Sequence, residues 1–313
     1  MEQELSAGTP AHGTPPASGN LFKGPDGLRA GWRLVIYIGI LIVGTLALGF
    51  LVRLFHINQN GLTTWGLLRQ EVPAFAIAFG AALILSRIEK RSPGVYGLPG
   101  REMFRGKFWL GFLFGLFEVS LLIWLIRLFG GYRFGAVALQ PADILKMGLL
   151  YLLGFTFVGL FEEFLFRGYT QYTLGDGIGF WPAAFVLSFL FGGVHLMNPG
   201  EGPVGAASVV MIALFFCFTL KRTGNLWYAV GLHASFDWGE TFLYSVPNSG
   251  LLMEGHLSHA VLKAGPRWLT GGTIGPEGSA FCFLTMLLQF LVVMWLFPAK
   301  KNEGITEAVT AQS

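Results

Sequence analysis

Apolar segments of about 20 residues recur along the chain, separated by shorter polar stretches and by stretches that contain Gly and Pro. A transmembrane helix needs about 20 mainly apolar residues to cross a hydrocarbon core about 30 Å thick. The pattern therefore predicts an all-α, polytopic membrane protein with about eight transmembrane helices. The expected helices span 34–54, 64–86, 108–128, a segment from Asp143 past residue 163, 181–195, 203–220, 226–246 and 279–297.

The polar stretches divide the chain into four regions. Residues 1–27 are rich in Gly, Pro, Ala, Thr and Ser and carry acids where a signal peptide carries bases, so we expect a disordered cytoplasmic tail. Residues 28–143 hold the first three helices, 144–298 the remaining membrane core, and 299–313 a polar tail. The stretch 247–278 is too long for a simple connection, and we expect it to pack on the protein or to shape the mouth of a cavity.

Composition supports a membrane location. Only 12% of the residues are charged, about half the share of roughly 25% that is usual in soluble domains. The two cysteines, Cys217 and Cys282, lie in apolar segments and form no disulfide framework or CxxC motif. We expect both to be small buried side chains.

The densest group of charges inside an apolar segment is Glu162, Glu163 and Arg167. On a helix, Glu163 and Arg167 lie on one face in the stabilising acid-before-base order, whereas Glu162 points about 100° away. Three ionised side chains facing lipid would cost roughly 7 to 10 kcal/mol, so they are expected to face protein or water. Glu162 has no partner at helical spacing and is the candidate for chemistry. The structural alternative is an ion-pair clasp between helices.

Two further patterns place a pair of residues on one helix face, Phe191 with His195 and His233 with Asp237. Together with Glu162, these residues are sufficient to hydrolyse an amide. Glu162 takes a proton from water, His195 orients or deprotonates that water, and His233 and Asp237 stabilise the oxyanion. Glu162, His195 and His233 would also form a zinc ligand set, although the HExxH signature is absent. We expect no cofactor, with zinc as the alternative.

In order and spacing, these motifs resemble those of the CAAX protease and bacteriocin-processing family of intramembrane endopeptidases, which includes the type II CAAX prenyl proteases. The matched patterns are EExxxR (Glu162, Glu163, Arg167), FxxxH (Phe191, His195) and HxxxN/D (His233, Asp237). The resemblance covers about residues 145–245. It implies an eight-helix membrane core in which Glu162 and His195 activate water and His233 and Asp237 lie at the oxyanion. Glu163, Arg167 and Phe191 then have structural roles around them.

The chain departs from the family at Asp237, where Asn is commoner. An ionised carboxylate only accepts hydrogen bonds, whereas an oxyanion needs donors. We favour a protonated Asp237 that donates. The alternative is an anionic Asp237 that orients His233, as a buried Asp orients the His of a serine-protease triad.

Glu162 and His195 would lie at different depths in the membrane if all helices were straight and perpendicular to it. Glu162 lies about 9 Å from the inner end of its helix if that helix ends at Gly168. His195 lies about 21 Å from the inner end of its own helix, counted from Trp181. Either the fourth helix continues beyond Tyr169, or the fifth tilts or breaks near Gly192–Gly193.

We therefore expect an intramembrane endopeptidase that acts on a membrane-anchored protein or peptide within the lipid bilayer and binds no nucleic acid. A rival from another class is a transporter or proton relay in which Glu162, the His residues and Glu118 titrate, but the paired repeats of many transporters are not evident. A third hypothesis is a catalytically silent partner or immunity protein. Glu118 and Glu240 are expected to be structural.

Basic residues predict the orientation. If the N-terminus is cytoplasmic, 14 of the 21 Lys and Arg lie in inner loops and tails and 7 in outer ones. The positive-inside rule therefore favours both termini in the cytoplasm, in the cell (inner) membrane. Single-cysteine labelling of intact cells checks this, and labelling of the loop around Lys90 from outside would contradict it.

Overall fold

The computed structural model describes residues 22–24, 27–57 and 61–299 and is all-α with two short antiparallel strand pairs. The α-helices are α1 (Ala30–Leu54), α2 (Thr64–Ile88), α3 (Gly106–Leu128), α4 (Pro141–Glu163), α5 (Thr170–Ile178), α6 (Phe180–His195), α7 (Pro203–Thr223), α8 (Trp227–Trp238), α9 (Arg267–Thr270) and α10 (Ala280–Leu296). Two π-helical turns are η3 (Phe164–Tyr169) and η4 (Gly239–Leu243), and three 3₁₀ turns are η1 (Pro93–Tyr96), η2 (Gly100–Glu102) and η5 (Pro276–Gly278).

The strands are short. β1 (Lys23–Gly24) pairs with β2 (Gly27–Leu28), and β3 (Tyr132–Arg133) pairs with β4 (Val261–Leu262). The expected disordered tail, residues 1–27, lies outside the described residues apart from this first hairpin. Residues 300–313 of the expected polar C-terminal tail lie outside them as well.

Five helical segments of the described chain are long and apolar enough to cross a membrane: Ala30–Leu54, Thr64–Ile88, Gly106–Leu128, Pro141–Ile178 and Pro203–Thr223. α6 and α10 are apolar but shorter. α8 and the π-turn η4 that follows it end at Leu243, before the expected residue 246. The chain is thus a multi-pass membrane protein, although eight transmembrane helices are not shown. The fourth helix does not begin at Asp143, the start expected from the sequence. α4 begins earlier, with Pro141 at its first position, and Asp143 lies in its first turn, where its charge suits the helix dipole.

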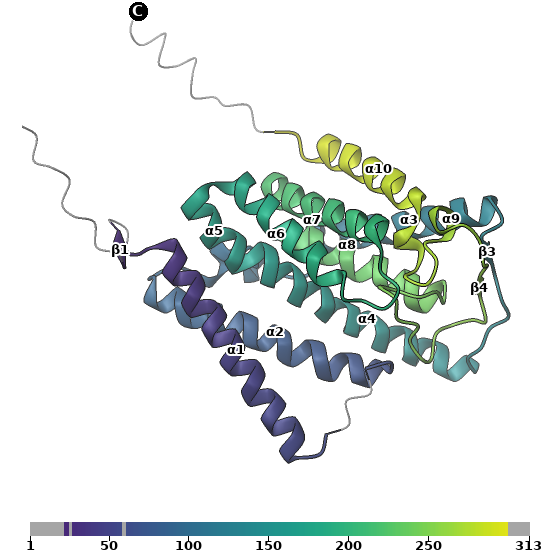
Figure 1. Cartoon of the computed structure of the whole chain (residues 1–313), viewed down its shortest axis with the longest axis horizontal. Coiled ribbons are helices and arrows are strands. Elements are labelled where there is room, and N and C mark those ends of the chain that lie inside the picture. The colour runs from purple at the N-terminus through teal and green to yellow at the C-terminus, as the bar shows by residue number, and fades with distance from the viewer. Residues whose placement is uncertain (1–21, 25–26, 58–60, 300–313) are drawn as a thin grey trace, which may run out of the picture.

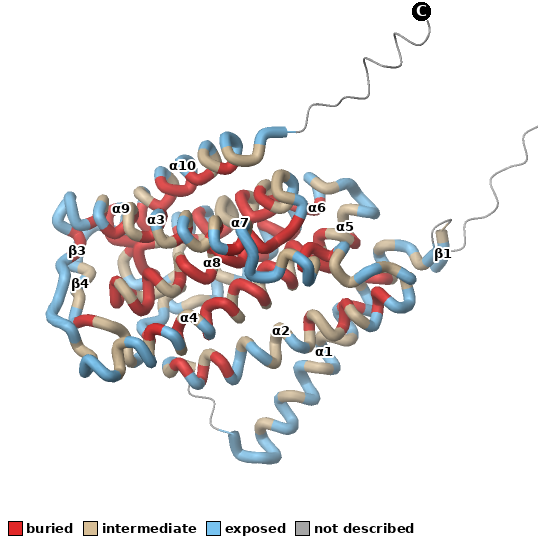
Figure 2. Tube along the Cα trace, turned by 180° about the vertical axis from the view of Figure 1, so that it is seen from behind, coloured by how far each residue is buried: buried red, intermediate tan, exposed pale blue. Residues whose placement is uncertain are grey.

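Helix α8 lies at the centre of the bundle, and none of its residues is exposed (Figure 2). Its closest neighbour is α3, because glycines remove the side chains at the crossing. A Cβ on Gly111 or Gly115 of α3 would lie within 2.3 Å of an α8 carbonyl oxygen, and one on Gly231 would lie 2.1 Å from the Phe108 oxygen. Small residues of this kind let membrane helices pack backbone to backbone. The contact fixes the helix that carries His233 and Asp237.

α4, η3 and α5 form one continuous rod from Pro141 to Ile178, bent at Gly168, whose ψ of −114° is not helical. The fourth helix therefore continues beyond Tyr169, which was one of the two expected ways to reconcile the depths. Measured along the rod, Glu162 lies about 24 Å from Ile178, and His195 lies about 22 Å from Phe180. The two residues are at matching depth.

The two ends of the bundle differ (Figure 1). α1 begins and α10 ends at one end, which we call the terminal end. The other, the loop end, carries the β3–β4 strand pair and residues 244–279, which include α9 and η5.

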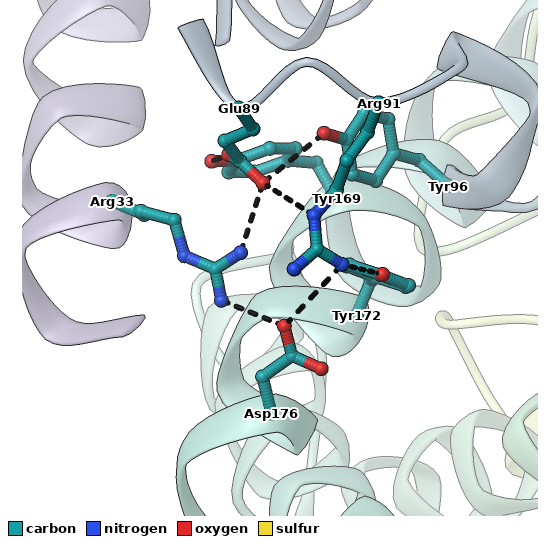
Figure 3. A network of polar contacts seen from close by, with 7 residues as sticks. All are labelled: Arg33, Glu89, Arg91, Tyr96, Tyr169, Tyr172 and Asp176. Carbon is teal, nitrogen blue, oxygen red and sulfur yellow. Dashed lines mark hydrogen bonds and ion pairs between the residues drawn. The ribbon is translucent and has the colours of Figure 1, made fainter. Parts of the chain in front are cut away.

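A polar network ties α1 to the terminal end (Figure 3). The Arg33 guanidinium lies 2.9 Å from Glu89 and 2.8 Å from Asp176, so one side chain joins α1 to the end of α2 and to α5. The Tyr169 hydroxyl donates to Glu89, and Arg91 contacts Glu89 at 3.6 Å. We call this network the Arg33 clamp. It attaches the first two helices to the rod just beyond η3.

The side chains of Arg33 and Glu89 are each only 6% exposed. Arg33→Gln therefore removes the positive charge that lies closest to the buried carboxylate of Glu89. We expect a loss of roughly 3–5 kcal/mol of stability. Arg91→Gln is the matched control, since Arg91 is 33% exposed and should lose under about 1 kcal/mol. Thermal melting in detergent measures both, and equal melting temperatures would show that the clamp does not hold α1.

Candidate active site

A chamber of about 550 Å³ lies inside the bundle and extends towards the loop end. Its walls come from α2, α3, α4, α6, α7, α8 and α10 and from the loops around Asn248 and Glu277, so the stretch 247–278 shapes a cavity, as expected. The side chains of Glu162, His195, His233 and Asp237 all line this chamber. Residues far apart in the sequence are therefore brought to one chamber.

The two adjacent glutamates have different surroundings. Glu163 is fully buried, and its Oε1 lies 3.3 Å from Nη1 of Arg167, which is 1% exposed. The Glu162 side chain is 26% exposed and faces the chamber. The helical spacing thus predicted correctly which glutamate pairs with Arg167.

Arg167 lies against three aromatic rings. Its guanidinium carbon is 4.4 Å from the centroid of Phe191, 5.6 Å from Phe216 and 5.7 Å from Phe166. Such contacts attract a cation to the ring faces, and more strongly when water is excluded. Phe191, which lines the chamber, therefore packs directly on the buried ion pair.

Both nitrogens of His233 face carboxylates. Nδ1 lies 3.0 Å from Glu163 Oε1, while Nε2 lies 3.5 Å from Asp237 Oδ2 and 3.7 Å from Glu162 Oε2. The ring stacks on Phe216 at 5.5 Å with an interplanar angle of 10°. Glu163 therefore holds the His233 ring as well as Arg167, a second role that the sequence pattern did not predict.

His195 is oriented from its own helix. Its Nδ1 lies 2.8 Å from the carbonyl oxygen of Phe191, and because a carbonyl only accepts, Nδ1 carries the proton. In the neutral ring, Nε2 is then the free acceptor. Across the part of the chain that the structure describes, no ion pair or hydrogen bond joins His195 to Glu162, although both line the chamber.

The alternative zinc set is not gathered into a ligand cluster. Among the described residues, no group of three or more His, Cys, Asp or Glu side chains is arranged to hold a metal ion. Glu162 Oε2 lies 3.7 Å from His233 Nε2, and no ion pair or hydrogen bond between described residues joins Glu162 to His195.

A π-helical turn follows each acidic catalytic candidate. η3 begins directly after Glu163 and contains Arg167, and η4 begins two residues after Asp237. Single π-turns inside α-helices are frequent at functional sites, where they change the direction of side chains. Hydrophobic periodicity does not predict them.

Three residues of this region were not expected from the sequence. Glu71 on α2 and Glu277 in η5 line the chamber, as does Phe216 under His233. Burial raises the pKa of Glu277 to about 8. Glu71 was detectable, because a lone acid in an apolar helix marks a functional position by default.

Comparison with known proteins assigns a family to one part of the chain. Residues 144–239 match the family model described as type II CAAX prenyl endopeptidase Rce1-like. This part of the chain, from the first turn of α4 to the start of η4, is therefore a domain of that CAAX protease family, as the motifs predicted. The family implies a membrane-embedded peptidase with a protein or peptide substrate. Among curated proteins, no match was found.

The different surroundings of the two glutamates predict different variants. Glu163→Gln leaves Arg167 buried without a counter-charge and should lose roughly 3–5 kcal/mol of stability. Glu162→Gln is the matched control, with the same substitution one residue away, and should keep the native melting temperature. Melting of both proteins in detergent tests this, and a Glu163→Gln protein as stable as the native one would contradict it.

Proposed function

We propose that the protein is an intramembrane endopeptidase that hydrolyses peptide bonds of a membrane-anchored protein or peptide. The observation that carries the proposal is the common chamber of Glu162, His195, His233 and Asp237. Both imidazoles have Nδ1 committed to a fixed acceptor, Phe191 O or Glu163. Two oriented rings and a partly exposed carboxylate form a site for attack by water.

Glu162 and His195 activate the water. Glu162 is the general base, because its side chain reaches the chamber while Glu163 is occupied by Arg167 and His233. His195 presents an Nε2 acceptor that orients the same water or takes its proton. The attacking water would lie between Glu162 and His195, which no ion pair or hydrogen bond joins in the described structure. The proposal assigns no step to a metal ion.

His233 and Asp237 stabilise the oxyanion. His233 donates from both nitrogens when it carries both protons, so Nδ1–H is held by Glu163 and Nε2–H is directed into the chamber. Of the two roles weighed for Asp237 we propose the donor, a neutral acid, because an ionised carboxylate only accepts hydrogen bonds and an oxyanion needs donors.

The orientation follows from the basic residues. With both termini in the cytoplasm, as the distribution of Lys and Arg favours, the loop end of the chamber faces the opposite side of the cell membrane. The substrate would then be reached from the membrane or from that side.

Glu162→Gln tests the proposed function. Comparing new peptide termini in membranes of cells with native or Glu162→Gln protein should show products that require Glu162. Purified native protein should cleave the same substrate without an equivalent of zinc in elemental analysis and without inhibition by a chelator. Identical products from Glu162→Gln would end the mechanism, and loss of activity on chelation with recovery on adding zinc would assign His195 and His233 as ligands.

Asp237→Asn separates the two roles of Asp237. If Asp237 donates as a neutral acid, Asn keeps turnover and extends it to higher pH, where the native acid ionises. If an anionic Asp237 orients His233, Asn should cost orders of magnitude, as the corresponding Asp→Asn change does in a serine-protease triad. We expect the first result in a pH–rate profile of both proteins. A collapse of the variant at every pH would establish the second.

A further inference from the structure

The chamber is lined by more acids than the proposed reaction uses. Its carboxyl groups are those of Glu71, Glu118, Glu162, Asp237 and Glu277. The basic groups among the described residues that line it are the imidazoles of His195 and His233, with no Lys or Arg. Arg167 does not line the chamber and is committed to Glu163. The walls therefore carry an excess of groups that can become negative.

Two of these acids have oxygens without a partner in the described structure. Glu118, on α3, is 1% exposed, and neither of its carboxyl oxygens has a hydrogen-bond partner. The hydroxyl of neighbouring Thr285 donates to the Cys282 carbonyl. Oε2 of Glu71 is likewise buried and without a partner. An ionised carboxylate buried in this way is costly unless a proton or another cation meets it.

We propose that the chamber binds a cationic segment of the substrate, with an ammonium or guanidinium group among Glu71, Glu118 and the neighbouring acids. That the chamber binds a cation rests on the chamber alone. That the cation lies beside the scissile bond rests on the proposed function.

The position of Glu71 supports this placement. It lines the same chamber as Glu162, His233 and Asp237, so a cation held by Glu71 shares the space in which Glu162 activates water. The same chamber is lined by apolar side chains such as Leu67, Phe155 and Val158. A Lys or Arg side chain pairs an apolar stem with a charged end and matches such walls. The volume of about 550 Å³ is that of a pocket for a short segment, not for a folded domain.

Binding of defined peptides tests the proposal with the full-length protein in detergent. The probes are fluorescent apolar peptides, amidated at the C-terminus and acetylated at the N-terminus, that differ at one central position: Lys, Arg, norleucine or Glu. A fifth probe has norleucine and a free amino terminus. Affinities are measured by anisotropy on Glu162→Gln protein, which removes cleavage during the measurement. Native protein is incubated with the same peptides and analysed by mass spectrometry.

We expect the Lys and Arg peptides to bind at least about tenfold more tightly than the norleucine peptide, a difference of about 1.4 kcal/mol. Adding Glu71→Gln or Glu118→Gln should each lower that ratio at least threefold. Glu254→Gln is the control, because this exposed acid at the loop end removes one charge without lining the chamber. Tight binding of the fifth probe alone would support the cation and place it at the substrate's amino terminus.

Other results overturn the proposal. Equal binding of Lys and norleucine peptides, or no saturable binding of any peptide, would mean that protons alone neutralise the chamber acids. A ratio unchanged in both Glu71→Gln and Glu118→Gln proteins would place the cation elsewhere. Charge-selective binding without cleavage would reject the proposed function and keep this inference. Cleavage of all peptides at equal rates would do the reverse.

Discussion

The buried ion pair of Glu163 and Arg167 is the interaction on which the site depends. Glu163 accepts from Arg167 and also holds Nδ1 of His233. The Arg167 guanidinium lies on Phe191 and Phe216, and these two rings contact His195 and His233 respectively. One charge pair thus orients both imidazoles, one through a hydrogen bond and one through a ring. Such a pair is costly to desolvate and costlier to break, so it gives position more than stability.

The rod made of α4, η3 and α5 carries two separate groups of charged and polar residues. Glu162 and Glu163 stand at its middle with Arg167, whereas Tyr169 and Asp176 belong to the Arg33 clamp at the terminal end. Only the bend at Gly168 separates the two groups. A Cβ added at Gly168 would lie 2.7 Å from the Phe164 ring. A larger residue at this position would therefore disturb both the site and the clamp.

Much of this arrangement was predictable, because it follows from the spacing of residues along single helices. Four-residue intervals placed Glu163 with Arg167 and His233 with Asp237, and the structure brings both pairs within 4 Å. The choice of Glu162 as the glutamate free of Arg167 also followed from helical geometry. The catalytic roles stay predictions, because geometry alone does not test them.

Other features depend on contacts that no local pattern records. The second role of Glu163 arises where α4 packs against α8, and the ring of Phe216 under His233 comes from α7. The π-turns change the hydrogen-bond register without changing the hydrophobic period. The expected eight spans assumed that every apolar run forms a long helix, whereas α6, α8 and α10 each have fewer than 18 residues.

The attachment of α1 has a mechanical consequence. Its only buried residues are Arg33 and Tyr37, and Figure 1 shows the helix diverging from α2 towards its far end. Beyond Gly44, which touches Ile77, the helix presents exposed side chains such as Leu46 and Phe50. A helix fixed at one end adjusts its tilt to the hydrocarbon thickness around it, at a cost of fractions of a kcal/mol per Å. A change in bilayer thickness would thus tilt α1 about its attachment at the Arg33 clamp, and this clamp adjoins the rod that carries Glu162.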